Sequence, residues 1–181
     1  MFRRMGGSTI WLVGMMGAGK SAVGRALARR RGEPFADSDA EVEAAAGCSV
    51  AEVFAREGEA AFRRLEREAV ERLAGRPGVV ALGGGAVAQP GMAERLRATG
   101  RVVYLRARPE TLAARVGEAG ERPLLAGVDA DARLARLRSL LAEREPHYLR
   151  ADIVVDTDAL DVAAAGAAVD AALAEAEGEG R

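Results

Sequence analysis

The sequence is poor in the residues that build disulfides, metal centres and membrane segments. Of its 181 residues one is cysteine, Cys48, and one is histidine, so an internal disulfide and a multi-thiolate metal site are excluded. No apolar run approaches the ~20 residues of a membrane-spanning helix, and residues 1–7 lack the apolar run of a signal peptide. We therefore expect a cytoplasmic protein with no membrane partner.

The chain also lacks an excess of either charge. It has 26 Lys and Arg against 27 Asp and Glu, a net charge of −1, which gives no polycationic surface for nucleic acid. It has no linker and no internal repeat, and its length suits one domain over residues 1–181 with a frayed end at 177–181. No coiled coil or broad apolar helix predicts self-association, so we expect a monomer.

Lysine is almost absent. Lys20 is the only lysine among the 26 basic residues, so arginine is used nearly everywhere a cation is needed. A compact ammonium fits between two phosphates where a planar guanidinium does not. The single lysine therefore indicates a position that arginine cannot fill.

Short apolar runs alternate with helical patterns along the whole chain. The runs cover residues 9–13, 34–36, 79–82, 102–105 and 153–155, and the clearest helical patterns cover 21–31, 130–144 and 163–176. Strands that alternate with helices favour a parallel sheet with helices on both faces. The predicted fold class is α/β, with sites beyond the carboxyl ends of the strands.

A phosphate-binding loop (P-loop) follows the first predicted strand. Residues 14–21 read Gly-Met-Met-Gly-Ala-Gly-Lys-Ser, which matches G-x-x-x-x-G-K-[ST] and lies between a strand and a helix. Backbone N–H groups of such a loop point at phosphates, Lys20 reaches the outer phosphates, and Ser21 holds Mg²⁺. The motif predicts binding of ATP or GTP with magnesium.

Other polar positions follow the later strands. Asp37 and Asp39 can divide between a metal and an acceptor hydroxyl, although a helix N-cap is the alternative interpretation. Three glycines at 83–85 let a small ligand approach the backbone. Arg63 and Arg144 can each clamp a carboxylate, although any single arginine here is more often a solvated surface charge.

Taken together, these motifs resemble the shikimate kinase family. The matching segments, in the family's order, are residues 14–21, 37–39, 62–64, 83–86, 122–125 and 144–148. The resemblance implies a three-layer P-loop kinase fold, a five-stranded parallel sheet of order 2-3-1-4-5, and a mobile lid over about residues 117–127. It also implies transfer of the γ-phosphoryl of ATP to the 3-hydroxyl of shikimate, a step in chorismate and aromatic amino acid biosynthesis.

The resemblance also implies roles for individual residues. Lys20, Asp39 and Arg122 would be catalytic, with Asp39 as base and Arg122 brought by the lid onto the transferring phosphate. Shikimate would be bound by Asp39, Arg63, Gly84 and Arg144, and Mg²⁺ by Ser21 and, through water, by Asp37. The residues expected to bind ATP are Gly14, Met16, Gly17, Ala18, Gly19, Lys20, Ser21, Arg115 and Arg122, with Arg115 against the adenine.

One segment departs from the family pattern, and two rival interpretations stay open. Where relatives place a polar loop with arginine over the adenine, this chain has Asp-Ala-Leu-Asp at residues 158–161. A different small-molecule kinase on the same fold, such as a gluconate kinase, also needs a P-loop and a lid. A non-catalytic module that senses ATP is the rival from another class, although it would not need Asp39 or Arg122.

Overall fold

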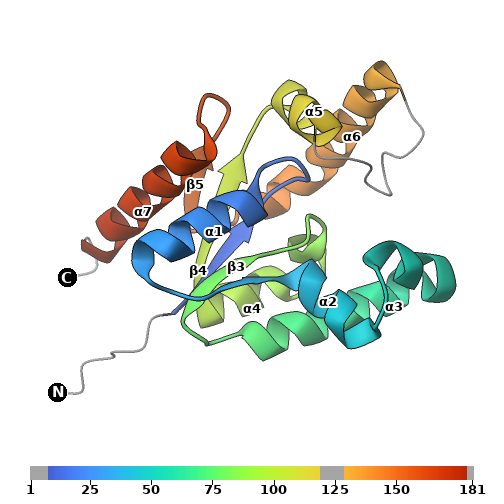
Figure 1. Ribbon diagram of the computed structural model, residues 1–181, viewed down its shortest axis with the longest axis horizontal. Helices are drawn as coiled ribbons and strands as arrows, with labels where there is room; N and C mark the ends of the chain where they lie inside the picture. The colour runs from blue at the N-terminus through green and yellow to red at the C-terminus, as the bar shows by residue number, and fades with distance from the viewer. Residues whose placement is uncertain (1–7, 119–128, 179–181) are drawn as a thin grey trace.

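The computed structural model describes residues 8–118 and 129–178 and is built on one parallel sheet (Figure 1). Its strands lie in the order β2-β3-β1-β4-β5, and each pair of neighbouring strands is parallel. The strands are β1 (Thr9–Val13), β2 (Phe35–Asp37), β3 (Gly78–Ala81), β4 (Gly100–Arg106) and β5 (Ile153–Asp156). The predicted fold class and strand order are confirmed.

Helices cover both faces of the sheet. α1 and α7 pack side by side over one face, and α4 lies against β4 on the other (Figure 1). The helices are α1 (Lys20–Arg31), α2 (Ser38–Ala46), α3 (Val50–Leu73), α4 (Met92–Thr99), α5 (Pro109–Glu118), α6 (Ala130–Tyr148) and α7 (Val162–Gly178), with a 3₁₀ turn, η1, at Ala86–Ala88.

The main core surrounds the central strands. All five residues of β1 are buried, as expected for a strand with helices on both sides, and the indole of Trp11 is fully covered. In the register, Leu12 pairs with Ala81 on one side and Val13 pairs with Tyr104 on the other. The carboxyl end of β1 is therefore flanked by β3 and β4, and the loop that follows it emerges between them.

α2 and α3 pack around a smaller core of their own. Val42, Val53, Phe62 and Ala69 form it, with the rings of Phe54 and Phe62 4.6 Å apart. A capping box at Ser49 starts α3. Gly58, at φ 81°, then breaks its helical geometry, which divides the helix into two arms, the second of which leads back to β3 (Figure 1).

Three predicted boundaries differ from the structure. α6 continues past residue 144 to Tyr148, with Pro146 inside it, because one missing N–H near a helix end costs little when packing holds the last turn. α7 continues to Gly178, past the predicted end at residue 176, and the expected fraying of 177–181 stays a prediction. Residues 117 and 118 end α5, and the rest of the expected lid, 119–127, lies outside the described residues.

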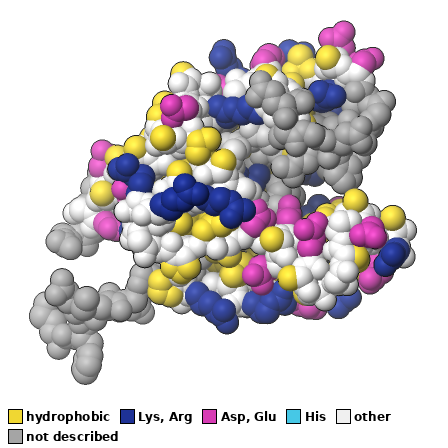
Figure 2. All heavy atoms as spheres, in the orientation of Figure 1, with side chains coloured by type: hydrophobic (Ala, Val, Ile, Leu, Met, Phe, Trp, Pro, Cys, Tyr) yellow, Lys and Arg dark blue, Asp and Glu magenta, His cyan; other side chains and the backbone are white. Residues whose placement is uncertain are grey.

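Charges of both signs are mixed on the surface. On the face that Figure 2 shows, basic and acidic side chains are interspersed with apolar ones. Among the described residues, no helix combines the length and the apolar character that crossing a membrane requires.

Candidate active site

The P-loop wraps around the amino end of α1. Gly17, at φ 82°, lies so close to α5 that a Cβ there would be 2.8 Å from the carbonyl oxygen of Leu112. Glycine is therefore required for the loop to take this path. The Lys20 ammonium donates to the carbonyl oxygens of Gly14 and Met15, both at 2.9 Å, so it lies folded over the loop.

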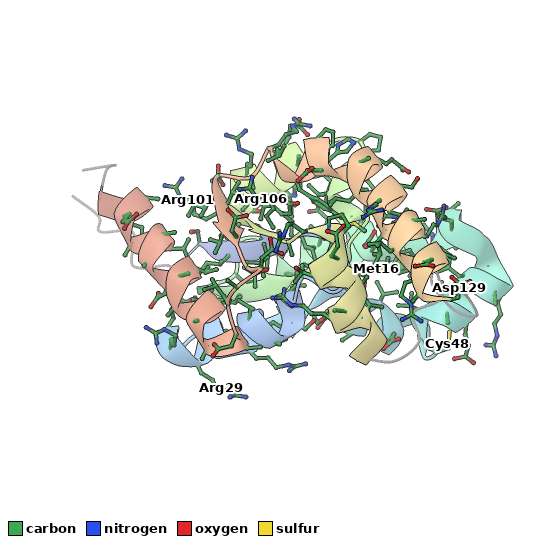
Figure 3. The ribbon with its side chains drawn as sticks, turned by 90° about the horizontal axis from the view of Figure 1, so that it is seen from above. Met16, Arg29, Cys48, Arg101, Arg106 and Asp129 are labelled. Carbon is green, nitrogen blue, oxygen red and sulfur yellow. The ribbon has the colours of Figure 1, made fainter. Side chains whose placement is uncertain are left out.

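The loop is central in the molecule. In Figure 3, which looks down from above, Met16 lies in the middle, while Arg29 and Cys48 lie at the rim. Residues 14–21 are brought together as one loop at the positive end of α1, the arrangement that binds phosphate.

Ser21 and Asp37 come together at the carboxyl edge of the sheet. The Ser21 hydroxyl donates to Asp37 Oδ2 at 2.6 Å, while Asp37 Oδ1 accepts from the backbone N–H of Asp39 at 3.0 Å. Asp37 is therefore the N-cap of α2 and a neighbour of Ser21 at once. A hydroxyl and a carboxylate beside a phosphate loop are the hard oxygen donors that suit Mg²⁺, which keeps phosphates and water as its other ligands.

The three glycines after β3 make room for charged side chains from three other elements. A Cβ on Gly83 would lie 2.7 Å from Asp39 Oδ1, and one on Gly85 would lie 2.5 Å from Arg63 Nη2. A Cβ on Gly84 would lie 3.6 Å from Arg144 Nη1. Asp39, Arg63 and Arg144 thus converge on one short loop, beside the phosphate loop.

A cavity of about 340 Å³ opens over the two converging arginines. Arg63, Arg144 and Gly85 line it, together with Arg67 and Gln89. Guanidinium groups that share a cavity favour an anionic ligand, and a carboxylate can take two parallel hydrogen bonds from either one. Glu59 and Glu143 line the cavity as well, so the arginines supply the anion-binding part of a site for a small acid.

Glu66 is a site residue for which the sequence interpretation gave no role. Its side chain is fully buried; Oε2 accepts from Arg63 Nη1 and from Gln89 Nε2, both at 2.7 Å. Burial raises the pKa of Glu66, and the charge of Asp39 raises it further, whereas Arg63 lowers it. The spacing of three between Arg63 and Glu66 on one helix was the signal for this pair.

Arg115 bonds to a different loop from the one on which Arg63 and Arg144 converge. Its guanidinium donates to the carbonyl oxygen of Thr157 at 2.6 Å, to Thr157 Oγ1 at 3.2 Å and to the carbonyl oxygen of Leu160 at 3.4 Å. It therefore joins α5 to the loop between β5 and α7, the loop expected near the adenine. Arg122 lies outside the described residues, so its expected role stays a prediction.

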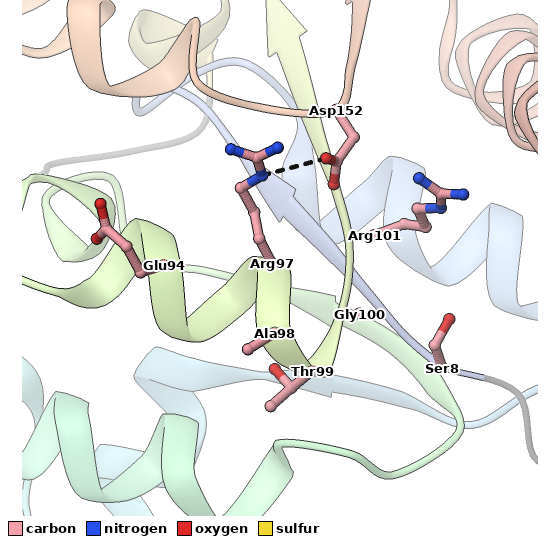
Figure 4. A pocket seen from close by; sticks show the side chains of 8 residues that line it. All are labelled: Ser8, Glu94, Arg97, Ala98, Thr99, Gly100, Arg101 and Asp152. Atoms are coloured by element: carbon pink, nitrogen blue, oxygen red, sulfur yellow. Dashed lines mark ion pairs between the residues drawn. The ribbon is translucent and has the colours of Figure 1, made fainter.

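A second hollow, of about 630 Å³, lies at the opposite end of the strands (Figure 4). It is lined by Ser8, Thr99 and Gly100, and Arg97 pairs there with Asp152 at 3.3 Å. The hollow contains none of the predicted site residues. Among the described residues, those predicted to bind or react with substrates lie at the carboxyl edge of the sheet instead.

The fold and these contacts define a P-loop kinase. The family model described as shikimate kinase matches residues 16–173. A shikimate kinase of Symbiobacterium thermophilum is 54% identical over 145 residues, which cover 78% of this chain and 82% of that protein. The solved shikimate kinase of Acinetobacter baumannii, in complex with shikimate, superimposes with a TM-score of 0.86 at 36% identity, covering 93% of this chain and 94% of that one.

The chain belongs to the shikimate kinase family, whose members are ATP-dependent kinases. The predicted family and enzyme class are confirmed, and the non-catalytic rival is not supported. A gluconokinase of Sinorhizobium meliloti reaches a TM-score of 0.51 at 23% identity, which is a likeness of fold alone. The gluconate kinase interpretation therefore has no comparable support.

Proposed function

We propose that this protein transfers the γ-phosphoryl of ATP to the 3-hydroxyl of shikimate, giving shikimate 3-phosphate and ADP. The observation that carries the proposal is the convergence of Asp39, Arg63 and Arg144 on residues 83–85 beside the phosphate loop. The carboxylate of Asp39 can accept hydrogen bonds from hydroxyl groups, and the two guanidinium groups can bind a carboxylate. Together they match the two ends of a hydroxylated acid. The solved relative in complex with shikimate supports the same assignment.

In the proposed mechanism, the backbone N–H groups of residues 14–21 hold the phosphates and Lys20 neutralises charge on the outer ones. Arg63, Arg144 and the backbone at Gly84 bind shikimate. Asp39 accepts the proton of the 3-hydroxyl. The oxygen of that hydroxyl forms a bond to the γ-phosphorus, while the bond between the γ-phosphorus and the β,γ-bridging oxygen breaks. Arg122, carried by the expected lid, would stabilise the equatorial oxygens.

Magnesium belongs to the proposal as well. Ser21 and, through water, Asp37 are the residues that would hold it. When bound, Mg²⁺ supplies positive charge that offsets the phosphate oxygens. Omission of Mg²⁺ should abolish turnover. A Ser21→Ala variant should need a higher Mg²⁺ concentration for half-maximal rate, with its melting temperature close to that of the native protein.

The direct test measures ADP release from ATP in three reactions, which contain shikimate, gluconate or no acceptor. Mass spectrometry identifies the product. Of the three reactions, we expect turnover only in the one that contains shikimate, with a product heavier than shikimate by one phosphoryl group. Turnover that is equal in all three reactions, or fastest with gluconate, would contradict the proposal. We further propose that the protein acts as a monomer in the cytoplasm, with light scattering as the check on its mass.

A further inference from the structure

A buried tyrosine connects the two substrate loops. Tyr148, the last residue of α6, is 1% exposed, and its hydroxyl donates to the carbonyl oxygen of Gly84. The sulfur of Met15 lies 3.4 Å from the same hydroxyl oxygen. One phenol therefore contacts both the loop expected to bind the acceptor and the loop that binds the phosphates.

The ring of Tyr148 is held in place. It stacks on Tyr104 of β4, with centroids 5.1 Å apart and planes 28° apart. The hydroxyl of Tyr104 donates to Glu145 Oε1 at 3.2 Å, which ties the same strand to α6. Burial raises the pKa of Tyr148 to about 12, so its hydroxyl keeps its proton and stays a donor at neutral pH.

The contact of Tyr148 lies where the two loops meet. A Cβ built on Gly84 would be 3.5 Å from the carbonyl oxygen of Gly14 and 3.6 Å from the backbone nitrogen of Met16. Arg144 precedes Tyr148 by four residues and so lies on the same face of α6. α6 thus presents a guanidinium and a hydroxyl to Gly84 from one side, while the phosphate loop lies on another.

We propose that Tyr148 is a positioning residue whose hydroxyl holds the Gly84 peptide against the phosphate loop and thereby sets the distance between acceptor and donor. The inference rests on the proposed function, because it assumes that Gly84 lies in the acceptor site. Phosphoryl transfer depends on alignment of the two substrates, and a misplacement of about 1 Å can cost roughly a hundredfold in rate. Removal of the hydroxyl should therefore affect turnover more than the binding of either substrate alone.

The test compares Tyr148→Phe with Tyr104→Phe. Each variant removes one buried hydroxyl from the same stacked pair, but the Tyr104 hydroxyl donates to Glu145 of α6 instead of to either loop. We expect Tyr148→Phe to lower kcat by roughly ten- to a hundredfold. It should also raise the ratio of ADP to shikimate 3-phosphate formed, because ATP that is not aligned with shikimate is hydrolysed by water. Tyr104→Phe should keep kcat within about twofold, with a comparable shift in melting temperature.

The outcomes separate the inference from the proposed function. Absence of shikimate phosphorylation by the native protein would refute the proposed function. An active native protein with Tyr148→Phe equal to Tyr104→Phe in kcat and in coupling would overturn the inference alone.

A second measurement decides the case if Tyr148→Phe does not fold. The chain has two tyrosines, so 3-fluorotyrosine in a Tyr104→Phe background labels Tyr148 alone. The inference expects the ¹⁹F resonance to shift on addition of shikimate and, separately, on addition of ADP with Mg²⁺. A resonance that neither ligand moves would overturn it.

Discussion

At the scale of single residues, the site depends on charged groups that the fold holds in unusual places. Lys20 is folded onto two carbonyl oxygens of its own loop, and Glu66 is a carboxylate with no exposed surface. Charge removed from water is costly unless paired, so the partly buried Lys20 and the fully buried Glu66 each indicate a position where a specific partner is required. Both residues can be tested by single substitutions, one that keeps the charge of Lys20 and one that keeps the shape of Glu66.

Lys20→Arg should leave a folded protein with little phosphoryl transfer. The Lys20 ammonium donates to two carbonyl oxygens, both at 2.9 Å. A guanidinium is planar and has a longer reach, so it does not fit between these two oxygens. We expect kcat to fall roughly a hundredfold or more, the usual cost of losing an oriented cationic donor. Steady-state kinetics and a melting curve check this, and near-normal turnover would refute it.

Glu66→Gln should weaken shikimate binding through Arg63. The amide keeps the shape of the side chain but removes the charge that orients the guanidinium at 2.7 Å. Loss of such a charge-assisted hydrogen bond costs about 1.5–3 kcal/mol, so the KM for shikimate should rise roughly tenfold or more, while the KM for ATP stays close to native. Glu68→Gln is the matched control, since Glu68 pairs with Arg64 on the exposed side of the same helix. An equal effect of the two variants would contradict this role.

Part of the site was predictable from the sequence, and part was not. The P-loop could be predicted because its motif is local and the flanking strand and helix are clear. Asp37 and Asp39 allowed two interpretations, metal or acceptor contact and N-cap; the structure makes Asp37 the N-cap of α2 and bonds it to Ser21, and its metal role stays a prediction. The burial of Glu66 and the reach of Tyr148 depend on packing between distant elements, which periodicity does not encode.

At the scale of elements, loops after the strands were predictable while the helix details were not. Apolar runs define the strands because both faces of the sheet are covered. The break of α3 falls at Gly58, a glycine with φ 81°, whereas the continuation of α6 through Pro146 depends on tertiary packing, which overrides local propensity. The three glycines after β3 predicted that a small ligand approaches the backbone; the structure shows that charged side chains approach it, and the ligand stays a prediction.

Gly85→Ala should displace Arg63. A Cβ there would lie 2.5 Å from Arg63 Nη2 and 2.9 Å from Nη1, closer than packing allows. We expect the KM for shikimate to rise roughly tenfold with little change for ATP, the pattern of a lost ground-state contact. Gly178→Ala is the control, because a Cβ there meets nothing within 4 Å. Native kinetics in Gly85→Ala would show that the guanidinium does not bind substrate at this position.

The loop between β5 and α7 should discriminate weakly between ATP and GTP. Three of its donors are already used, since the Thr157 N–H and hydroxyl both donate to the carbonyl oxygen of Arg106 and the Leu160 N–H donates to the carbonyl oxygen of Thr157. Arg115 is likewise bonded to this loop. Strong discrimination needs a dedicated hydrogen bond to one base, so a preference for ATP above roughly 10⁴-fold in kcat/KM would refute the prediction.

At the scale of the whole molecule, two sets of carboxyl groups make opposite contributions to stability as pH changes. Hydrogen bonds from Arg106 and Arg138 lower the pKa of Asp156 and of Glu110, respectively, at the surface. Such groups stabilise the fold above their ordinary pKa values of 3.8 and 4.5, and this contribution is lost as pH falls through their folded values. Glu66 has a raised pKa, so its contribution is complete below 4.5 and is lost as pH rises through its folded value.

The free energy of unfolding of the native protein should therefore fall when pH is lowered below about 4, and added salt should weaken this trend because the surface pairs are screened. Glu66→Gln cannot titrate at residue 66, so its stability relative to the native protein should increase as pH rises from 4.5 toward neutrality. Urea unfolding followed by circular dichroism between pH 3 and 8, with and without salt, measures both trends. A stability difference between the two proteins that stays constant across this range would show that Glu66 does not titrate differently in the folded and unfolded chains. If the stability of Glu66→Gln relative to the native protein instead increased as pH fell, Arg63 would outweigh burial and lower the pKa of Glu66 in the folded protein.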